Sequence, residues 1–315
     1  MHVLYFHQHF STPQGAAGTR SYEMAQALIR AGHSVTVVCG TYAQGKTGLE
    51  APFSKGRRRG IVDGVDVIEF GLDYSNDMGF VHRVGAFLKF AIGSIGVALR
   101  EPADVVFATT TPLTAGMPGI FARWLARKPF VFEVRDLWPE LPKAMGVITN
   151  PVVLWIMSVL EWASYRSADR LVGLSPGIVE GIVARGVDKS RIAMVPNGCD
   201  MGLFSTPEAA WRPDGVLDDQ LLAIFTGTHG YANGLDSVLN AAAVLRERGR
   251  DDICIALVGQ GREKPKLIAD AEERGLKNVL FLDPVPKHKL SGLMAGADLG
   301  LQVLRNIPAF YFGTS

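Results

Sequence analysis

Short apolar runs alternate with helical stretches along almost the whole chain, and this alternation constrains the fold more than any other feature. Most of the runs are continuously apolar, which is typical of parallel strands that are buried on both faces of a sheet. Repeated strand–helix units of this kind build doubly wound α/β domains. In the first part of the chain we expect strands at 2–6, 34–38, 104–109, 129–134, 170–174 and 191–195, a hairpin at 61–70, and helices at 19–31, 82–100, 113–127, 151–168 and 177–185.

The alternation is interrupted once, in the stretch "VPNGCDMGLFSTPEAAWRPDG" at 195–215. Proline and Asn-Gly turn chemistry there indicates a linker between domains. We therefore predict one α/β domain over 1–200 and a second over 201–315. The second domain is incomplete, because we expect no helix after its last strand. Its expected elements are strands at 221–226, 253–258, 278–282 and 298–304 and helices at 235–248, 263–274 and 287–296.

Composition excludes several classes of function. With 315 residues and 48% hydrophobic content the chain can fill two cores, and its net charge of +1 argues against a nucleic-acid partner. The three cysteines stand singly and form no zinc-binding or redox spacing, as expected for reduced thiols in the cytoplasm. The N-terminus lacks a basic stretch and a long apolar core, so we expect no secretory signal and a cytoplasmic protein.

Two segments, 85–99 and 151–165, are unusually apolar. Neither reaches the ~20 apolar residues of a membrane span, so the first interpretation is a pair of helices buried against the sheet. The alternative is peripheral docking on a membrane, because aromatic and basic residues gather near the second helix. These residues are Trp155, Trp162, Arg166 and Arg170.

The loop after the first expected strand reads "HQHFSTPQGAAGTRS" and holds two histidines. His7 and His9 would bind a metal ion only with further ligands, and no cluster of His, Cys or Asp lies near them in the sequence, so we expect no metal. A dinucleotide fingerprint would need a third glycine and an acidic residue after the second strand. The loop has only Gly15 and Gly18, and residues 38–41 contain no acid, so we do not expect NAD.

The same loop predicts an anion site. Gly15 and Gly18 let the backbone approach an anion closely, and a helix that opens near Thr19 presents free N–H groups and the positive end of its dipole. Arg20 would add a planar cation. We therefore expect a phosphate here. The alternatives are an ordinary strand-to-helix turn and a solvated arginine.

Several stretches, in a fixed order along the chain, resemble the retaining GT-B glycosyltransferases of family 4. The resemblance covers nearly all of the 315 residues. It is carried by "GAAGTRSYEMAQALIRAGHSVTVV", "SPGIVEGIVARGVDKSRIAMVPNGCDMGLF", "FTGTHGYANGLDSVLNAAAVL", "LVGQGREKPKL" and "NVLFLDPVPKHKLSGLMAGADLGL". The stretches "YFHQHFSTPQGAAGTRSYE" and "FEVRDLWPE" resemble the branch that builds bacterial O-antigen, capsule and exopolysaccharide.

The resemblance implies a fold, a reaction and partners. The fold would be GT-B, with two Rossmann-like domains that face each other across a cleft. The reaction would move a sugar from a nucleotide diphosphate donor, most commonly a UDP-sugar, to a lipid-linked or oligosaccharide acceptor. Members of the family work without a metal, so neither a metal nor another cofactor is expected. The enzyme would work in the cytoplasm, at the inner face of the cytoplasmic membrane.

The resemblance also places the donor diphosphate. It would lie against backbone at Gly227 and Thr228 and at the N-terminus of the helix that begins near Leu235. Many relatives carry an arginine and a lysine in this loop, and "GTHGYANG" has neither. The candidates to replace them are His229, Asn233 or Arg262.

Two further loops of the second domain take part in the expected donor site. Gly259 and Gly261 would permit close approach of the strand-to-helix loop to the donor. The nucleotide base would contact the backbone between Asp283 and Val285. All of these positions follow strands of the second domain, as expected for ligands of α/β sheets.

The stretch "FEVRDLWPE" holds the expected catalytic residues, Arg135 and Asp136, at the carboxyl end of a buried strand. Arg135 would stabilise charge on the leaving phosphate, and Asp136 would orient the acceptor hydroxyl. Many relatives have a histidine where Arg135 stands, so a histidine-based role does not carry over. The alternative for this pair is an internal Arg–Asp salt bridge that fixes the loop.

The family's paired-glutamate motif follows the last strand expected here, and "FGTS" stands where that motif would begin. We therefore expect the sequence to be truncated, and a chain that ends there would lack half of its donor site. Two other functions stay open at this point. One is a nucleotide-sugar epimerase of the same architecture, which would turn over the free nucleotide sugar. The other is a non-catalytic, glycosyltransferase-like partner subunit.

Overall fold

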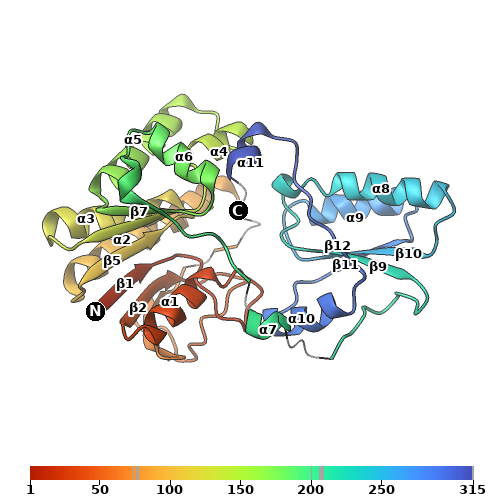
Figure 1. Cartoon of the computed structure of the whole chain (residues 1–315), viewed down its shortest axis with the longest axis horizontal. Coiled ribbons are helices and arrows are strands. Elements are labelled where there is room, and N and C mark those ends of the chain that lie inside the picture. The colour runs from red at the N-terminus through yellow and green to blue at the C-terminus, as the bar shows by residue number, and fades with distance from the viewer. Residues whose placement is uncertain (73, 76–77, 200, 206–208, 314–315) are drawn as a thin grey trace. The chain divides into compact units, whose positions relative to one another are not determined.

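Figure 1 shows the computed structural model of the chain, which describes residues 1–72, 74–75, 78–199, 201–205 and 209–313. The chain forms two compact units, each built on its own sheet. Unit 1 comprises Met1–Gly198 together with the segment that begins at Ile307, and unit 2 comprises Cys199–Asn306.

The sheet of unit 1 has eight strands in the order β3-β4-β2-β1-β5-β6-β7-β8. Its neighbouring strands pair in parallel except β3 and β4, which form the predicted hairpin. The hairpin turns at Asp63 and Gly64, whose φ angles of 49° and 80° suit the tight two-residue turn. The strands are β1 His2–Phe6, β2 Ser34–Gly40, β3 Arg57–Val62, β4 Val65–Phe70, β5 Val105–Thr109, β6 Phe130–Val134, β7 Arg170–Gly173 and β8 Ile192–Met194.

The continuous apolar runs serve two cores, one on each face of this sheet. In β1, Leu4 and Phe6 lie in one buried cluster, whereas Val3 and Tyr5 lie in the other. Because successive side chains of a strand point to opposite faces, a strand buried on both faces must be apolar at every position. The prediction of a doubly wound sheet is therefore confirmed.

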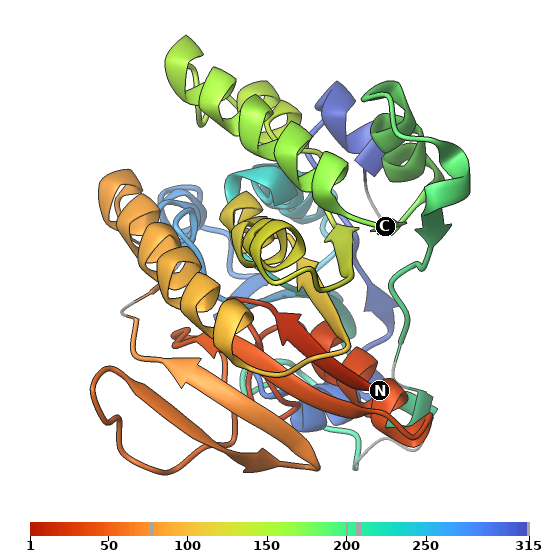
Figure 2. The ribbon, with the colours of Figure 1, turned by 90° about the vertical axis from the view of Figure 1, so that its left-hand side faces the viewer.

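Helices cover both faces of the sheet. Helix α1 lies on the side of Val3 and Tyr5, and Ala25 packs into that cluster. Helices α2, α3 and α5 lie side by side on the other face, where Figure 2 shows them in orange, yellow and green. The helices of unit 1 before its last segment are α1 Arg20–Arg30, α2 Phe80–Arg100, the 3-10 turn η1 Leu113–Gly116, α3 Met117–Leu125, α4 Glu140–Ala144, α5 Pro151–Ser167, α6 Pro176–Ala184 and the 3-10 turn η2 Lys189–Arg191.

Unit 2 has a parallel sheet of four strands in the order β11-β10-β9-β12. Helices α8 and α9 cover one face, with Leu239 and Leu267 in that core, and α10 covers the other face through Leu293. The elements are α7 Met201–Ser205, β9 Leu221–Thr226, the 3-10 turn η3 Tyr231–Asn233, α8 Asp236–Glu247, β10 Ile253–Val258, α9 Lys264–Glu273, β11 Val279–Leu282, α10 Lys287–Ala295 and β12 Leu299–Gly300.

The expectation that no helix follows the last strand is wrong. Helix α11, Pro308–Gly313, follows β12 and packs against α4 and α6, and Phe310 is buried there. Proline at the first position suits a helix start, but six residues are too few to show a helical period. The segment from Ile307 therefore lies with unit 1, although the sequence assigns all of 201–315 to one domain.

The strand expected at 298–304 is shorter in the structure. β12 pairs with β9 alone and spans Leu299–Gly300. Beyond it the backbone N–H of Arg305 donates to the carbonyl of Ala232, so the chain turns toward the loop before α8. An edge strand has one neighbour to hold it, and a competing hydrogen bond can end it early.

Candidate functional site

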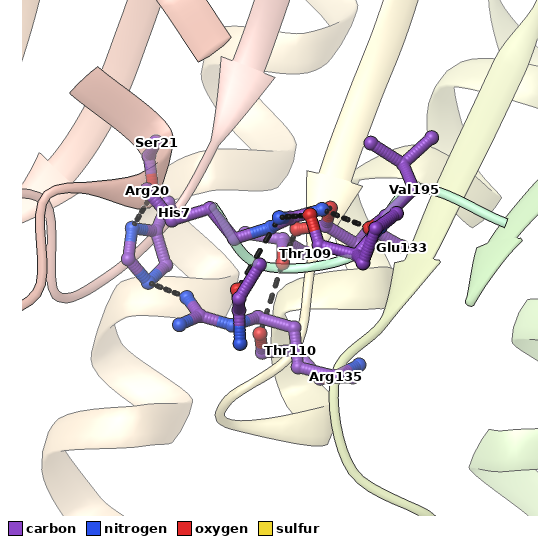
Figure 3. Close-up of polar contacts among 10 residues, drawn as sticks. His7, Arg20, Ser21, Thr109, Thr110, Glu133, Arg135 and Val195 are labelled. Atoms are coloured by element: carbon purple, nitrogen blue, oxygen red, sulfur yellow. Dashed lines mark hydrogen bonds and ion pairs between the residues drawn. The ribbon is translucent and has the colours of Figure 1, made fainter. Parts of the chain in front are cut away.

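Polar side chains gather at the carboxyl ends of three neighbouring strands of unit 1, β1, β5 and β6 (Figure 3). The carboxyl ends of parallel strands meet at one edge of a sheet, and α/β sheets bind ligands at that edge. The N-terminal turn of α1 reaches the same edge. We call the group the carboxyl-edge network; its residues are His7, Arg20, Ser21, Thr109, Thr110, Glu133 and Arg135.

His7 lies between Ser21 and Arg135. Its Nε2 is 3.3 Å from Nη1 of Arg135, and its Nδ1 makes a short contact with the hydroxyl of Ser21. A guanidinium can only donate hydrogen bonds, so Nε2 must accept and the ring proton must sit on Nδ1. His7 therefore donates to Ser21 and accepts from Arg135, which fixes one neutral tautomer of the ring.

The surroundings keep His7 neutral. The side chain is buried, and burial lowers its pKa well below the ordinary value of 6.5, with the nearby charge of Arg135 acting in the same direction. His9 is held differently, because its ring packs 4.6 Å from Tyr74 and 5.1 Å from Tyr42 between ring centroids. Burial lowers the pKa of His9 to about 4. Among the described residues, no group of three or more His, Cys, Asp or Glu side chains could hold a metal ion.

Arg20 is neither solvated nor free. Glu133 is fully buried, and its Oε1 accepts from Nη2 of Arg20 at 2.7 Å, while its Oε2 accepts from the Thr109 hydroxyl at 2.6 Å. The guanidinium also donates to the carbonyls of Val195 and Pro196, each at 2.8 Å. Arg20 thus ties α1 and β6 to the segment after β8. To bind a phosphate, as the sequence predicts, the guanidinium would have to leave a buried carboxylate.

Arg135 and Asp136 point to different partners. The Arg135 side chain reaches His7, and its backbone N–H donates to the Thr110 hydroxyl at 2.8 Å. Asp136 accepts from the Thr111 hydroxyl at 3.0 Å, and burial raises the pKa of its carboxyl. In the part of the chain that the structure describes, Arg135 and Asp136 form no ion pair, so the alternative of an internal salt bridge is not seen.

The opening loop uses its two glycines in different ways. A Cβ on Gly15 would lie 2.8 Å from the backbone nitrogen of Lys46, whereas Gly18 has open space around it. The N–H groups of Gly15 and Ala16 already donate to the carbonyls of Thr12 and Gln44. Gly15 is thus required by the fold of the loop itself. Thr19 stands at the N-terminal boundary of α1 and is buried, and phosphate binding at this turn stays a prediction.

In unit 2, Gly227, Gly259 and Gly261 allow two loops to pack backbone against backbone. A Cβ on Gly259, which has a φ of +148°, would lie 1.8 Å from the carbonyl oxygen of Gly227. A Cβ on Gly261 would lie 2.5 Å from the carbonyl oxygen of His229. The loop after β9 and the loop after β10 are thus held in direct contact at the carboxyl edge of this sheet. The His229 ring is fully buried beneath them, and burial lowers its pKa to about 4, so it is not presented to a ligand.

The other expected donor residues lie along the same edge. The side-chain amide of Asn233 donates to the carbonyl of Thr228 at 2.5 Å and so closes the loop before α8. Val285 is half-buried against the core under α10. Arg262 is exposed, and its guanidinium makes no hydrogen bond or ion pair with any residue that the structure describes. Arg262 is therefore an exposed and unpaired cation at this edge.

Lys264 also contributes to this edge, and the sequence gives no sign of its role. Its ammonium group is buried and donates to the carbonyls of Gly259 and Leu282 and to Oδ1 of Asp283, at 3.0, 2.9 and 3.0 Å. It thereby connects the ends of β10 and β11. Sequence alone does not separate it from Lys266, which stands two residues later in the same helix and is exposed.

Two units, one with a mainly parallel and one with a parallel sheet, each carry polar or Gly-rich loops at the carboxyl edge. They define a class: two-domain α/β proteins of the GT-B type. The sequence matches the family described as "Glycosyl transferase 4-like domain" over residues 15–198 and that described as "Glycosyl transferases group 1" over residues 208–304. The chain belongs to these glycosyltransferases, of the retaining family 4 type.

Named relatives agree with this assignment. The chain is 22% identical over 317 residues to a protein named as a colanic acid biosynthesis glycosyl transferase, WcaI, of Escherichia coli (strain K12), with 96% of this chain and 76% of that one covered. It is 18% identical to the solved structure of WaaG, a glycosyltransferase involved in lipopolysaccharide biosynthesis, with a TM-score of 0.64 and coverages of 96% and 75%. It is also 18% identical to Anabaena HepE in complex with UDP and glucose, with a TM-score of 0.60 and coverages of 96% and 74%. At these identities the solved structures confirm the fold.

Proposed function

We propose that this glycosyltransferase moves a sugar from a UDP-sugar to a lipid-linked or oligosaccharide acceptor in the synthesis of a bacterial surface polysaccharide. The observation that carries the proposal is the His7–Arg135 pair, a cation held by a neutral histidine at the ligand-binding edge of unit 1. The names of WcaI and WaaG support the biosynthetic role, and the UDP complex of HepE supports the donor class.

In this proposal unit 2 binds the donor. The N-terminus of α8 and the backbone of Gly227 and Thr228 would face the diphosphate, since helix N-termini bind anions. Arg262 would add the positive charge that relatives draw from the loop before α8. The base would contact backbone near Val285. We propose that no metal and no other cofactor takes part.

In the transfer itself, the bond between the anomeric carbon and the diphosphate oxygen breaks, and a bond to an acceptor hydroxyl oxygen forms. The diphosphate leaves with the bonding electrons, and Arg135 would stabilise the negative charge that develops. Asp136, whose carboxyl pKa is raised by burial, would orient the acceptor hydroxyl, and the proton of that hydroxyl would pass to the leaving diphosphate oxygen. The anomeric configuration is retained, as in family 4.

The acceptor that we propose is carried by a lipid, so the enzyme would work at the cytoplasmic face of the membrane. A sugar donor that is soluble and an acceptor that is lipid-linked meet only at that surface. An epimerase of the same architecture would instead convert the nucleotide sugar in the absence of any acceptor, and a partner subunit would bind no donor.

Calorimetry with UDP, GDP, TDP, ADP and NAD, in the presence of EDTA, tests the donor site. We expect one nucleoside diphosphate to bind selectively, and the Arg262→Ala variant to bind it about 10- to 100-fold more weakly, because a charge-assisted hydrogen bond contributes ~1.5–3 kcal/mol. Lys277→Ala, which removes an exposed cation between the end of α9 and the start of β11, is the control and should bind as the parent does. Binding of NAD alone, or of none of the five, would refute the proposal. Turnover of the nucleotide sugar without acceptor would favour the epimerase.

A further inference from the structure

The helices α2, α3 and α5 expose apolar side chains on the side that faces away from the sheet. On α5, Trp155 and Trp162 are 66% and 64% exposed, and on α3, Trp124 is 66% exposed. The three helices lie side by side, so these residues belong to one surface (Figure 2). We call it the three-helix face, and its largest exposed apolar side chains are Ile92, Trp124, Leu125, Trp155, Ile156 and Trp162.

The spacing of the exposed apolar residues of α5 shows that they form one stripe along the helix. Val152, Trp155, Val159 and Trp162 recur every three or four residues, which is the period of one helix face. The opposite face of α5 is buried, and Asn150 caps its first turn. This stripe is therefore apolar although it faces away from the protein. Large exposed apolar patches of this kind mark interaction sites.

Other helices of the same chain do not have this property. The exposed positions of α9 include Lys266, Glu272 and Glu273, as expected for a helix that covers a sheet and faces water. The contrast excludes a general apolar bias of the sequence as the cause.

Apart from the buried Glu161, the charged side chains of the three helices are cations, and one of them, Arg123, pairs with Asp169 just after α5 at 3.0 Å. Within Phe80–Arg100 and Met117–Leu125 there is no acidic residue. The one carboxylate of α5, Glu161, is buried and pairs with Arg185 at 3.2 Å. Lys89 and Arg166 are exposed, and neither forms an ion pair with another described residue. Exposed tryptophans among unpaired cations complement an anionic lipid surface, where indole rings sit at the headgroup level.

Helix α2 is not itself a membrane span in this fold. Over Val81–Arg100 it is long and apolar enough to cross a membrane, the one helix among the described residues of which this is true. Phe90, Val97 and Ala98 pack into the core of unit 1, however. Only the outer side of α2 can therefore contact a membrane surface.

We infer that the three-helix face docks unit 1 on the anionic phospholipid surface of a membrane. Each of the three helices follows the carboxyl end of one strand and leads back to the start of a parallel strand, so its first turn lies at the edge that holds the carboxyl-edge network. Docking would thus bring Arg135 close to acceptors that are anchored in the bilayer. The inference rests on the proposed function for its purpose, but the docking itself needs neither donor nor acceptor.

Flotation with lipid vesicles tests the docking. The parent protein should float with vesicles of phosphatidylcholine mixed with phosphatidylglycerol, and much less with phosphatidylcholine alone. We expect Trp155→Glu/Trp162→Glu to weaken binding by roughly tenfold for each tryptophan, because the apolar area buried in the lipid is lost. Lys89→Gln/Arg166→Gln should reduce the preference for the anionic lipid. The matched control is Val244→Glu on the outer side of α8, which is 43% exposed and lies off the face.

Two further measurements distinguish a loss of membrane binding from a loss of folding in the variant. Brominated lipids should quench the tryptophan fluorescence of the parent protein, and Trp155→Glu/Trp162→Glu should keep the melting temperature and the nucleotide affinity of the parent. Failure to float, equal binding to both vesicle types, or unchanged binding by the tryptophan variant would each overturn the inference. So would a parent dimer that this variant makes monomeric without any effect of vesicles, because the face would then bind a second copy. Loss of nucleotide binding with intact flotation would count against the proposed function alone.

Discussion

The neutral Nδ1–H tautomer of His7 lets one ring contact a hydrogen-bond donor on one side and an acceptor on the other. Arg135 requires an acceptor, and Ser21 presents a hydroxyl that can accept the Nδ1 proton. A protonated His7 would carry a hydrogen on Nε2, which could then no longer accept from the Arg135 guanidinium, so this hydrogen bond would be lost. The low pKa of His7 is therefore part of what positions Arg135.

Replacing His7 should lower catalysis according to the acceptor that is left. His7→Leu removes the acceptor for Arg135, and we expect kcat to fall about 10- to 100-fold, since hydrogen bonds to charged groups contribute ~1.5–3 kcal/mol. His7→Asn keeps a side-chain carbonyl and should recover part of the loss. Measured kcat and donor affinity for both variants, with their melting temperatures, would show this. Equal loss in the two variants would mean that the ring acts by packing.

Arg20 and Glu133 make a second residue-level prediction. Arg20→Leu leaves the Glu133 carboxylate buried without its cation, so we expect a loss of ~3–5 kcal/mol in the free energy of unfolding. Arg20→Leu/Glu133→Leu removes both charges and should recover most of it. Urea unfolding of the three proteins measures the effect. If Arg20→Leu instead kept its stability and lost nucleotide affinity, the phosphate role predicted from the sequence would be favoured.

For single residues, the sequence predicts the position along a strand better than the side chain that the residue contacts. Arg135 and Asp136 are placed correctly at the end of a buried strand, because an apolar run fixes where a strand stops. The partner of Arg135 is His7, 128 residues away, and no local pattern reveals it. Glu133 sits inside the run "FVFEV" and gives no signal that it pairs with Arg20 across the sheet. Long-range pairing depends on the order of the strands, which periodicity does not contain.

At the scale of elements, the two packed loops of unit 2 depend on glycine. Gly259→Ala would place a methyl group against the carbonyl of Gly227 at a strained φ, so we expect a loss of ~1–3 kcal/mol and weaker nucleotide binding. Gly230→Ala, in the partner loop after β9, is the control, because its Cβ would lie at an ordinary 3.4 Å from Thr228. Thermal melting and calorimetry test both. A Gly259→Ala variant as stable as Gly230→Ala would contradict the packing.

The helices that the sequence does not predict are all short. The strands at 2–6, 221–226 and 253–258 agree with the structure to the residue, because each is a long apolar run between turn signals. Helices α4, α7 and α11 have five or six residues and complete less than two turns, so they show no period. What holds α11 is packing against α4 and α6, and that information lies in distant parts of the chain.

For the whole molecule, buried neutral histidines predict a loss of stability in acid. The pKa of His9 and of His229 is lowered to about 4, and that of His7 lies well below 6.5. At these histidines, between pH 6.5 and 4, the unfolded chain binds protons that the folded chain does not, so their contribution to stability falls as the pH falls. The buried Glu161, whose pKa is raised to about 7, acts in the opposite direction. Each histidine contributes up to ~1.4 kcal/mol per pH unit. Urea midpoints at several pH values measure the slope, and His9→Phe, which suits its aromatic surroundings, should make it shallower. An unchanged slope would contradict the assignment.

The return of α11 to α4 and α6 has a mechanical consequence. The backbone leaves unit 1 after Gly198 and comes back at Ile307, so unit 2 is an insertion that is tethered at both of its ends. A protease that nicked the linker near Cys199 would therefore not release unit 2, because the second tether and the α11 contacts would still hold it.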